Sequence, residues 1–179
     1  MFNFRSIVVL VILLVLVALV MVNHQHREQG AILFEQYFDA DPPAGYGLQR
    51  SLQAAGGNDL DASILRQGIL YHQQQAYDLA LPALRAYLES NPVPESYLPQ
   101  LLAATAALAT GEFAEGAAYL EAMPTEEEEA AAAAAWYRGL LALREEKYKE
   151  ADTQLRLVEK YWPTHPYPVA KLLDSEGLG

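Results

Sequence analysis

The chain has 179 residues, of which 52% are apolar and none is cysteine, and its formal net charge is −11. Such an acidic chain lacks the basic face that nucleic acid requires, so we exclude a nucleic-acid-binding protein. The lack of cysteine excludes disulfides and thiolate metal sites, and the length suits one membrane segment plus one small domain.

An unbroken apolar run at residues 7–22 dominates the N-terminal part of the chain. It holds sixteen residues, fourteen of which are Leu, Ile or Val. A helix over residues 2–22 would rise about 32 Å, which is enough to cross a hydrocarbon core of about 30 Å. No A-x-A-like cleavage site follows the run. We therefore predict an uncleaved transmembrane signal anchor over residues 1–27 rather than a cleaved signal peptide.

The charges beside this run encode its orientation only weakly. Arg5 lies on one side and Arg27 on the other, so the positive-inside rule is nearly balanced. A short N-terminal tail before a first anchor favours an N-terminus on the inside. In a bacterium this predicts a single-pass protein of the inner (cytoplasmic) membrane, with its C-terminal domain in the periplasm.

Residues 28–58 form a predicted juxtamembrane connector. Within it, residues 31–38 place Ile32, Leu33, Tyr37 and Phe38 at helical spacing, and a stretch rich in Pro and Gly then breaks regular structure. These aromatic side chains could bind a partner, but packing against the first repeat or the lipid headgroups is the interpretation that we favour.

Three similar segments follow, and they begin at residues 61, 97 and 132. The first and third share an ordered set of Gly, turn Tyr, Ala, Leu and closing Pro, while the second carries a Gly-Glu-Phe turn at residues 111–113. The shared positions are Gly68, Tyr77, Ala80, Leu84 and Pro92 in the first segment, and Gly139, Tyr148, Ala151, Leu155 and Pro163 in the third. This order and spacing resemble the tetratricopeptide repeat (TPR), a helix–turn–helix unit of 34 residues.

The resemblance implies an all-α fold, in which the N-terminal transmembrane helix precedes an α-solenoid of about three TPR-like hairpins. Residues 59–179 would form this repeat domain, and a short helix at residues 169–173 would cap its end. Thr125 and Glu128 form a predicted capping box before the third segment. The second segment departs from the pattern because it has Ala104 where Gly is common, and the third has Arg138 where Leu is typical.

The resemblance also implies a protein-binding groove lined by the first helix of each hairpin. The residues at its lining positions are Leu65, Ile69, His72, Leu101, Thr105, Leu108, Trp136, Leu140 and Leu143. This lining is mostly apolar, and no Lys or Arg lies between Arg85 and Arg138, so an apolar peptide or helix with a basic flank would suit it. An alternative remains open, in which residues 31–38 or 48–55 of the chain itself fill the groove.

No spacing typical of a catalytic, metal-binding or phosphate-binding site stands out in the sequence. We therefore expect no enzyme activity, no cofactor, no metal and no small-molecule substrate. The chain is similar in architecture to bacterial single-span membrane-anchored TPR proteins. The sequence predicts a membrane-tethered adaptor or scaffold for protein–protein interaction, and the alternative is a permanent structural accessory subunit of a larger membrane protein complex.

Overall fold

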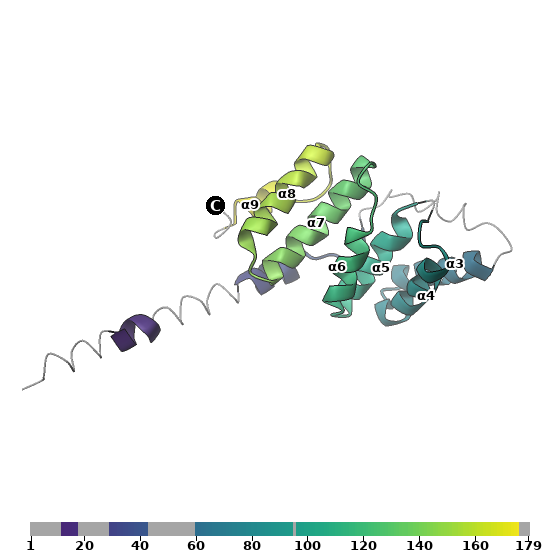
Figure 1. Cartoon of the computed structure of the whole chain (residues 1–179), viewed down its shortest axis with the longest axis horizontal. Coiled ribbons are helices and arrows are strands. Elements are labelled where there is room, and N and C mark those ends of the chain that lie inside the picture. Colours follow the sequence, from purple (N-terminus) through teal and green to yellow (C-terminus); the bar gives the residue numbers. More distant parts are fainter. Residues whose placement is uncertain (1–11, 18–28, 43–59, 95, 176–179) are drawn as a thin grey trace, which may run out of the picture.

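The computed structural model describes residues 12–17, 29–42, 60–94 and 96–175, and all regular structure in these residues is helical. The predicted all-α class is therefore confirmed. Six helices pair in chain order, α3 with α4, α5 with α6 and α7 with α8, and a short α9 packs against α8 (Figure 1). Their bounds are α3 Leu60–Gln73, α4 Tyr77–Ser90, α5 Leu98–Ala109, α6 Phe113–Glu121, α7 Glu128–Arg144, α8 Tyr148–Tyr161 and α9 Val169–Leu173.

The three turns inside these hairpins have the same backbone geometry. Each has one residue with positive φ, which is 59° at Gln75, 84° at Gly111 and 63° at Glu146. In each turn the amide of the next residue donates to the carbonyl oxygen five positions back, as Ala76 does to Tyr71 with an N–O distance of 2.9 Å. This is the Schellman ending of a helix, and it recurs at intervals of 36 and 35 residues.

Small residues let the two helices of a hairpin approach each other closely. A Cβ atom placed on Gly68 of α3 would lie 2.9 Å from Cγ of Leu84 in α4. In the third hairpin, a Cβ on Gly139 of α7 would lie 3.0 Å from Cδ2 of Leu155 in α8. Both leucines are fully buried. The first and third hairpins therefore use the same glycine–leucine contact, sixteen residues apart in each.

The second hairpin reverses this contact and is shorter. Here the glycine is Gly116 on the second helix, and it faces Leu108 on the first, whose Cδ2 would lie 2.8 Å from an added Cβ. Helix α6 has only nine residues. Arg138 of α7 compensates for this early end, because its Nη2 donates to the carbonyl oxygen of Leu120 at 2.7 Å.

The start of α7 differs from the sequence prediction. The helix begins at Glu128, its N-cap residue is Glu127, and no side chain forms a cap hydrogen bond there. The predicted capping box of Thr125 and Glu128 is therefore wrong. Helix α7 is instead held by burial, since every residue from Ala130 to Tyr137 is buried among its neighbours. Six consecutive alanines in this stretch leave room for close packing.

Most of the predicted anchor lies outside the described residues. Its described part, residues 12–17, is helical, and its apolar side chains are 44–59% exposed. Among the helices that the structure describes, none combines the length and the hydropathy that crossing a bilayer would need. The second stretch that we considered as a groove occupant, residues 48–55, also lies outside the described part.

Candidate functional site

The nine predicted groove residues come from the first helices of the three hairpins, and all nine are buried. Their exposed fractions lie between 0% and 2%. The list is Leu65, Ile69 and His72 in α3, Leu101, Thr105 and Leu108 in α5, and Trp136, Leu140 and Leu143 in α7. The structure thus brings these residues together inside the molecule rather than on an open surface. Contact between them and a partner stays a prediction.

A segment of the predicted connector lies against these first helices. We call residues 29–42 the docked segment; residues 29–37 are helical, and the segment passes beneath α7 in the view of Figure 1. Leu33, Phe34 and Ala40 are only 6–8% exposed. Gly30 lies so close to α7 that an added Cβ would collide with the carbonyl oxygen of Leu143. The docked segment is therefore part of the hydrophobic core.

Four aromatic rings join the docked segment to the repeat domain. Phe34 and Phe38 are four residues apart on one side of the helix and stack with their centroids 5.0 Å apart. Phe34 also meets Phe113, at the start of α6, edge-on at 6.0 Å, and Phe38 meets Tyr137 of α7 edge-on at 6.2 Å. Edge-to-face contacts at such distances are favourable beyond their buried area. The two phenylalanines thus hold the segment on the second and third hairpins.

Polar contacts hold the C-terminal end of the docked segment. The Tyr137 hydroxyl donates to the backbone carbonyl oxygen of Asp39 at 2.9 Å. Gln75 Nε2 donates to a carboxylate oxygen of Asp41 at 3.3 Å, and the other oxygen lies 3.6 Å from Nδ1 of His72. The segment consequently contacts the third hairpin at Gly30 and the first hairpin at Asp41, and Phe34 contacts the second between them.

His72 is an uncharged link within this arrangement. Its Nε2 lies 2.9 Å from the Thr105 hydroxyl, and its ring packs edge-on against Tyr77 at 5.1 Å. Burial lowers the pKa of His72 to about 4, although the nearby Asp41 carboxylate opposes this shift. At neutral pH the contact between His72 and Asp41 is therefore not an ion pair.

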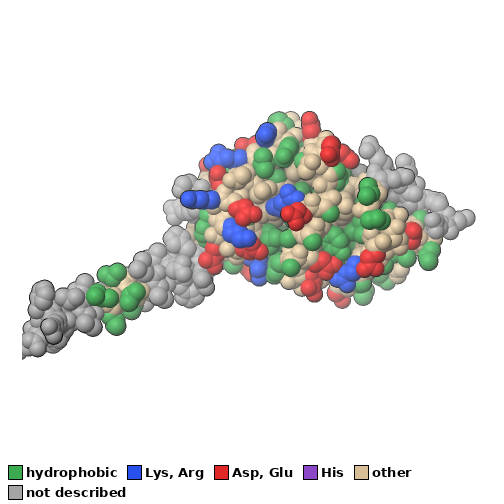
Figure 2. Space-filling view, viewed as in Figure 1, with side chains coloured by type: hydrophobic (Ala, Val, Ile, Leu, Met, Phe, Trp, Pro, Cys, Tyr) green, Lys and Arg blue, Asp and Glu red, His purple; other side chains and the backbone are tan. Residues whose placement is uncertain are grey.

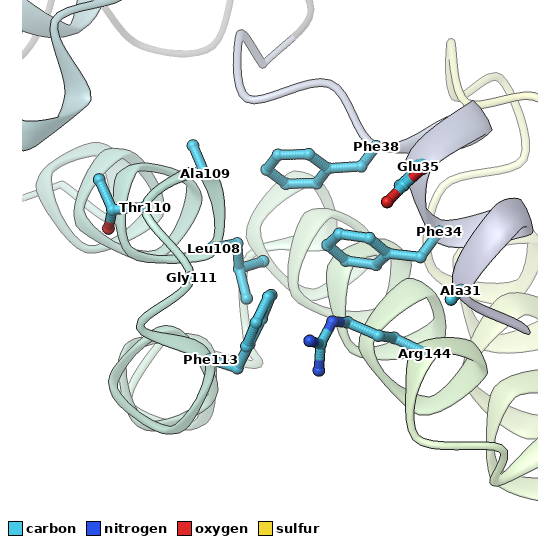
Figure 3. Close-up of a pocket in the computed structure, with 10 residues that line it drawn as sticks. All are labelled: Ala31, Phe34, Glu35, Phe38, Leu108, Ala109, Thr110, Gly111, Phe113 and Arg144. Atoms are coloured by element: carbon cyan, nitrogen blue, oxygen red, sulfur yellow. The ribbon is translucent and has the colours of Figure 1, made fainter.

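A hollow of about 420 Å³ remains between the docked segment and the repeat domain. Its lining residues are Ala31, Phe34, Glu35, Phe38, Leu108, Ala109, Thr110, Gly111, Phe113 and Arg144. Figure 3 shows Phe34, Phe38 and Phe113 pointing into it from two sides, with Arg144 at its edge. The Arg144 guanidinium carbon lies 3.5 Å from the centroid of the Phe113 ring, which is a cation–π contact.

Trp136, the largest of the nine predicted groove residues, is covered by the C-terminal tail. Tyr167 stacks on its indole with centroids 5.0 Å apart and also meets Tyr137 edge-on. The predicted C-terminal cap at residues 169–173 is confirmed by α9, which packs against α8, but sequence reasoning missed the contact of Tyr167 with Trp136 and the roles of Tyr137 and Arg144. The helical spacing of the aromatic residues in the docked segment was the available signal, but it did not identify the surface that they cover.

The surface charges are mixed, and their signs are unevenly placed. On the face shown in Figure 2, most Lys and Arg side chains lie over the side formed by α7, α8 and α9. This agrees with the sequence, in which seven of the twelve Lys and Arg residues follow position 137. Within the described residues, no group of three or more His, Asp or Glu side chains could hold a metal ion.

Comparisons with known proteins add no family to these observations. No protein-family model matches the chain, and no curated protein or solved structure matches it either. The resemblance to TPR proteins therefore depends on the residues quoted above.

Proposed function

We propose that this chain is a membrane-tethered, non-catalytic scaffold of three TPR-like hairpins that docks another protein. The observation that carries the proposal is the repetition of one turn at Gln75, Gly111 and Glu146. A unit repeated in tandem buries its apolar side against its neighbours and forms an extended surface, which is how solenoid proteins bind partners. The glycine–leucine contacts within the hairpins support the same interpretation.

The tether in this proposal is the apolar run at residues 7–22. Its described residues, 12–17, are helical and leave their apolar side chains exposed, as a lipid-facing helix would. A single anchor confines the repeat domain to two dimensions and raises its effective concentration toward other membrane proteins. In this proposal the chain crosses the membrane once, and its repeat domain lies in the periplasm.

Two exposed apolar side chains give the partner accessible first contacts. Ile32 of the docked segment is 59% exposed and Leu70 of α3 is 50% exposed. Because the chain carries a net charge of −11, a partner with basic residues beside an apolar segment would be attracted to it.

Site-specific photocrosslinking in native membranes tests this function. A photoreactive side chain is placed at Ile32 or Leu70 of the full chain, and at exposed Glu159 of α8 as the control. We expect a defined protein product from Ile32 or Leu70 that Glu159 does not give. Identical products at all three positions, or none at all, would contradict the scaffold. A product that co-purifies in fixed stoichiometry through gentle detergent would instead support the permanent accessory subunit.

A further inference from the structure

We infer that the docked segment is a displaceable occupant of the partner-binding surface. The partner that displaces the docked segment presents an amphipathic helix with two aromatic side chains four residues apart. This inference rests on the proposed function and adds to it the chemistry of the partner. It concerns the surface formed by Phe113, Tyr137, Leu143 and Arg144.

The docked segment itself shows which chemistry this surface accepts. A short helix lies on it with Phe34 and Phe38 on the inner side, against Phe113 and Tyr137. The outer side of that helix is exposed at Ile32 and Gln36. This division into an aromatic inner side and an open outer side is the pattern of a helix bound in a groove.

The fit of the docked segment is incomplete, which leaves room for a better occupant. The hollow of about 420 Å³ beside Phe34 and Phe38 is partly open to solvent, so these two rings do not fill the surface that they contact. A larger aromatic side chain at either position would fill part of this space against Leu108 and Phe113. A partner helix with tryptophan there would gain contacts that the chain's own segment lacks.

The polar contacts of the Asp41 side chain would cost little to exchange. The Asp41 side chain is 46% exposed, and the His72 imidazole that faces it is uncharged at neutral pH. Departure of the segment would instead uncover the Tyr137 ring, which Phe38 contacts and which is only 1% exposed. An empty surface is therefore unfavourable, whereas replacement by another helix is not, so we infer exchange rather than simple release.

A synthetic peptide of residues 29–42 tests exchange on the full chain in detergent. Its fluorescence anisotropy is followed with the wild-type chain and with Gly30→Ala, where the added methyl collides with the Leu143 carbonyl. A second variant, Phe34→Ala with Phe38→Ala, removes the aromatic contacts instead. The control is Gln36→Ala, which truncates an exposed side chain of the same helix. Circular dichroism checks that each chain remains helical.

We expect the peptide to bind both variants at least about tenfold more tightly than the wild-type or Gln36→Ala chain, because apparent affinity scales with the fraction of vacant surface. A peptide carrying Phe34→Trp should bind more tightly still, and one carrying both alanines should not bind. Equal or absent binding to all folded chains would overturn the inference, as would dimers held by exchanged segments. Photocrosslinking from Leu70 tells the two failures apart. It still gives a product if this inference fails and the scaffold function holds.

Discussion

The phenol of Tyr137 donates a hydrogen bond of 2.9 Å to the backbone carbonyl oxygen of Asp39, ninety-eight positions away in the sequence. Tyr137 is 1% exposed, and its ring also meets Phe38 and Tyr167. This single side chain therefore connects the docked segment, the third hairpin and the C-terminal tail.

Replacing Tyr137 with phenylalanine should loosen the docked segment without unfolding the hairpins. The ring contacts remain, but the lost hydrogen bond is worth about 1 kcal/mol, which corresponds to a roughly fivefold change in a local opening equilibrium. Hydrogen exchange should accelerate at residues 29–42 and stay unchanged in α3. Tyr161→Phe, at a partly exposed phenol of α8, is the control. Unchanged exchange in the segment would show that the bond does not hold it.

Gly68→Ala should destabilise the first hairpin, although alanine is the better helix former. The added methyl meets Cγ of the fully buried Leu84 at 2.9 Å, and overpacking of this kind costs about 1–3 kcal/mol. Leu84→Ala, which removes both carbons that the added methyl meets, should cost less in the Gly68→Ala chain than in the wild-type chain. Urea unfolding of both single variants and the double variant measures this coupling. A stabilised Gly68→Ala chain would mean that the helices separate easily at this point.

The three turns predict opposite effects of glycine and alanine. Gln75 and Glu146 adopt positive φ, which costs a residue with a side chain about 1–2 kcal/mol. Glu146→Gly should therefore raise the melting temperature, even after the greater chain entropy of glycine is counted. Gln75→Gly should raise it less, because it also removes the hydrogen bond from Gln75 to Asp41. Gly111→Ala should lower it. Glu145→Gly, next to one of these positions but at φ −87°, serves as the control and should not stabilise the chain.

Stability should fall between about pH 6.5 and pH 4 because of His72. Its pKa is about 4 in the folded chain and about 6.5 when unfolded, so the unfolded chain binds the proton first as the pH falls. The contribution is complete above pH 6.5, and on the order of 3 kcal/mol is lost by pH 4. Denaturation midpoints at pH 7.5 and 5 measure this loss.

His72→Gln should flatten the stability profile in that range. Glu115 contributes separately, since its hydrogen bond with Arg85 lowers its carboxyl pKa below 4.5. Its share of the stability is therefore lost only at lower pH. An equally steep slope in His72→Gln between pH 6.5 and 5 would assign the effect to other groups.

Much of the hairpin arrangement could be predicted because its signals are local. Gly68 and Gly139 each precede a buried leucine by sixteen residues, and aromatic residues follow each turn. The same local logic failed at the start of α7, where burial of the alanine run, rather than a capping side chain, determines the helix. Arg138 could be recognised as a departure from the repeat pattern, but its hydrogen bond to the Leu120 carbonyl depends on where α6 ends.

The candidate site was less predictable, because it depends on contacts between distant parts of the chain. The lining positions in α3, α5 and α7 follow from repeat spacing, but their burial depends on what packs over them. Phe34 and Phe38 could be recognised as one side of a helix. Only the folded chain shows that this side meets Phe113 and Tyr137, which lie 79 positions after Phe34 and 99 positions after Phe38.

The length of the docked segment also matches the number of hairpins that it crosses. The segment contacts Leu143 of the third hairpin through Gly30 and His72 of the first hairpin through Asp41. Its fourteen residues therefore span the width of three stacked units. If a fourth unit were inserted, for example by duplicating residues 111–146, the same segment could not touch both ends of the array. Lengthening this protein by gene duplication would therefore require a longer docked segment. Otherwise the inner side of one hairpin would be left uncovered.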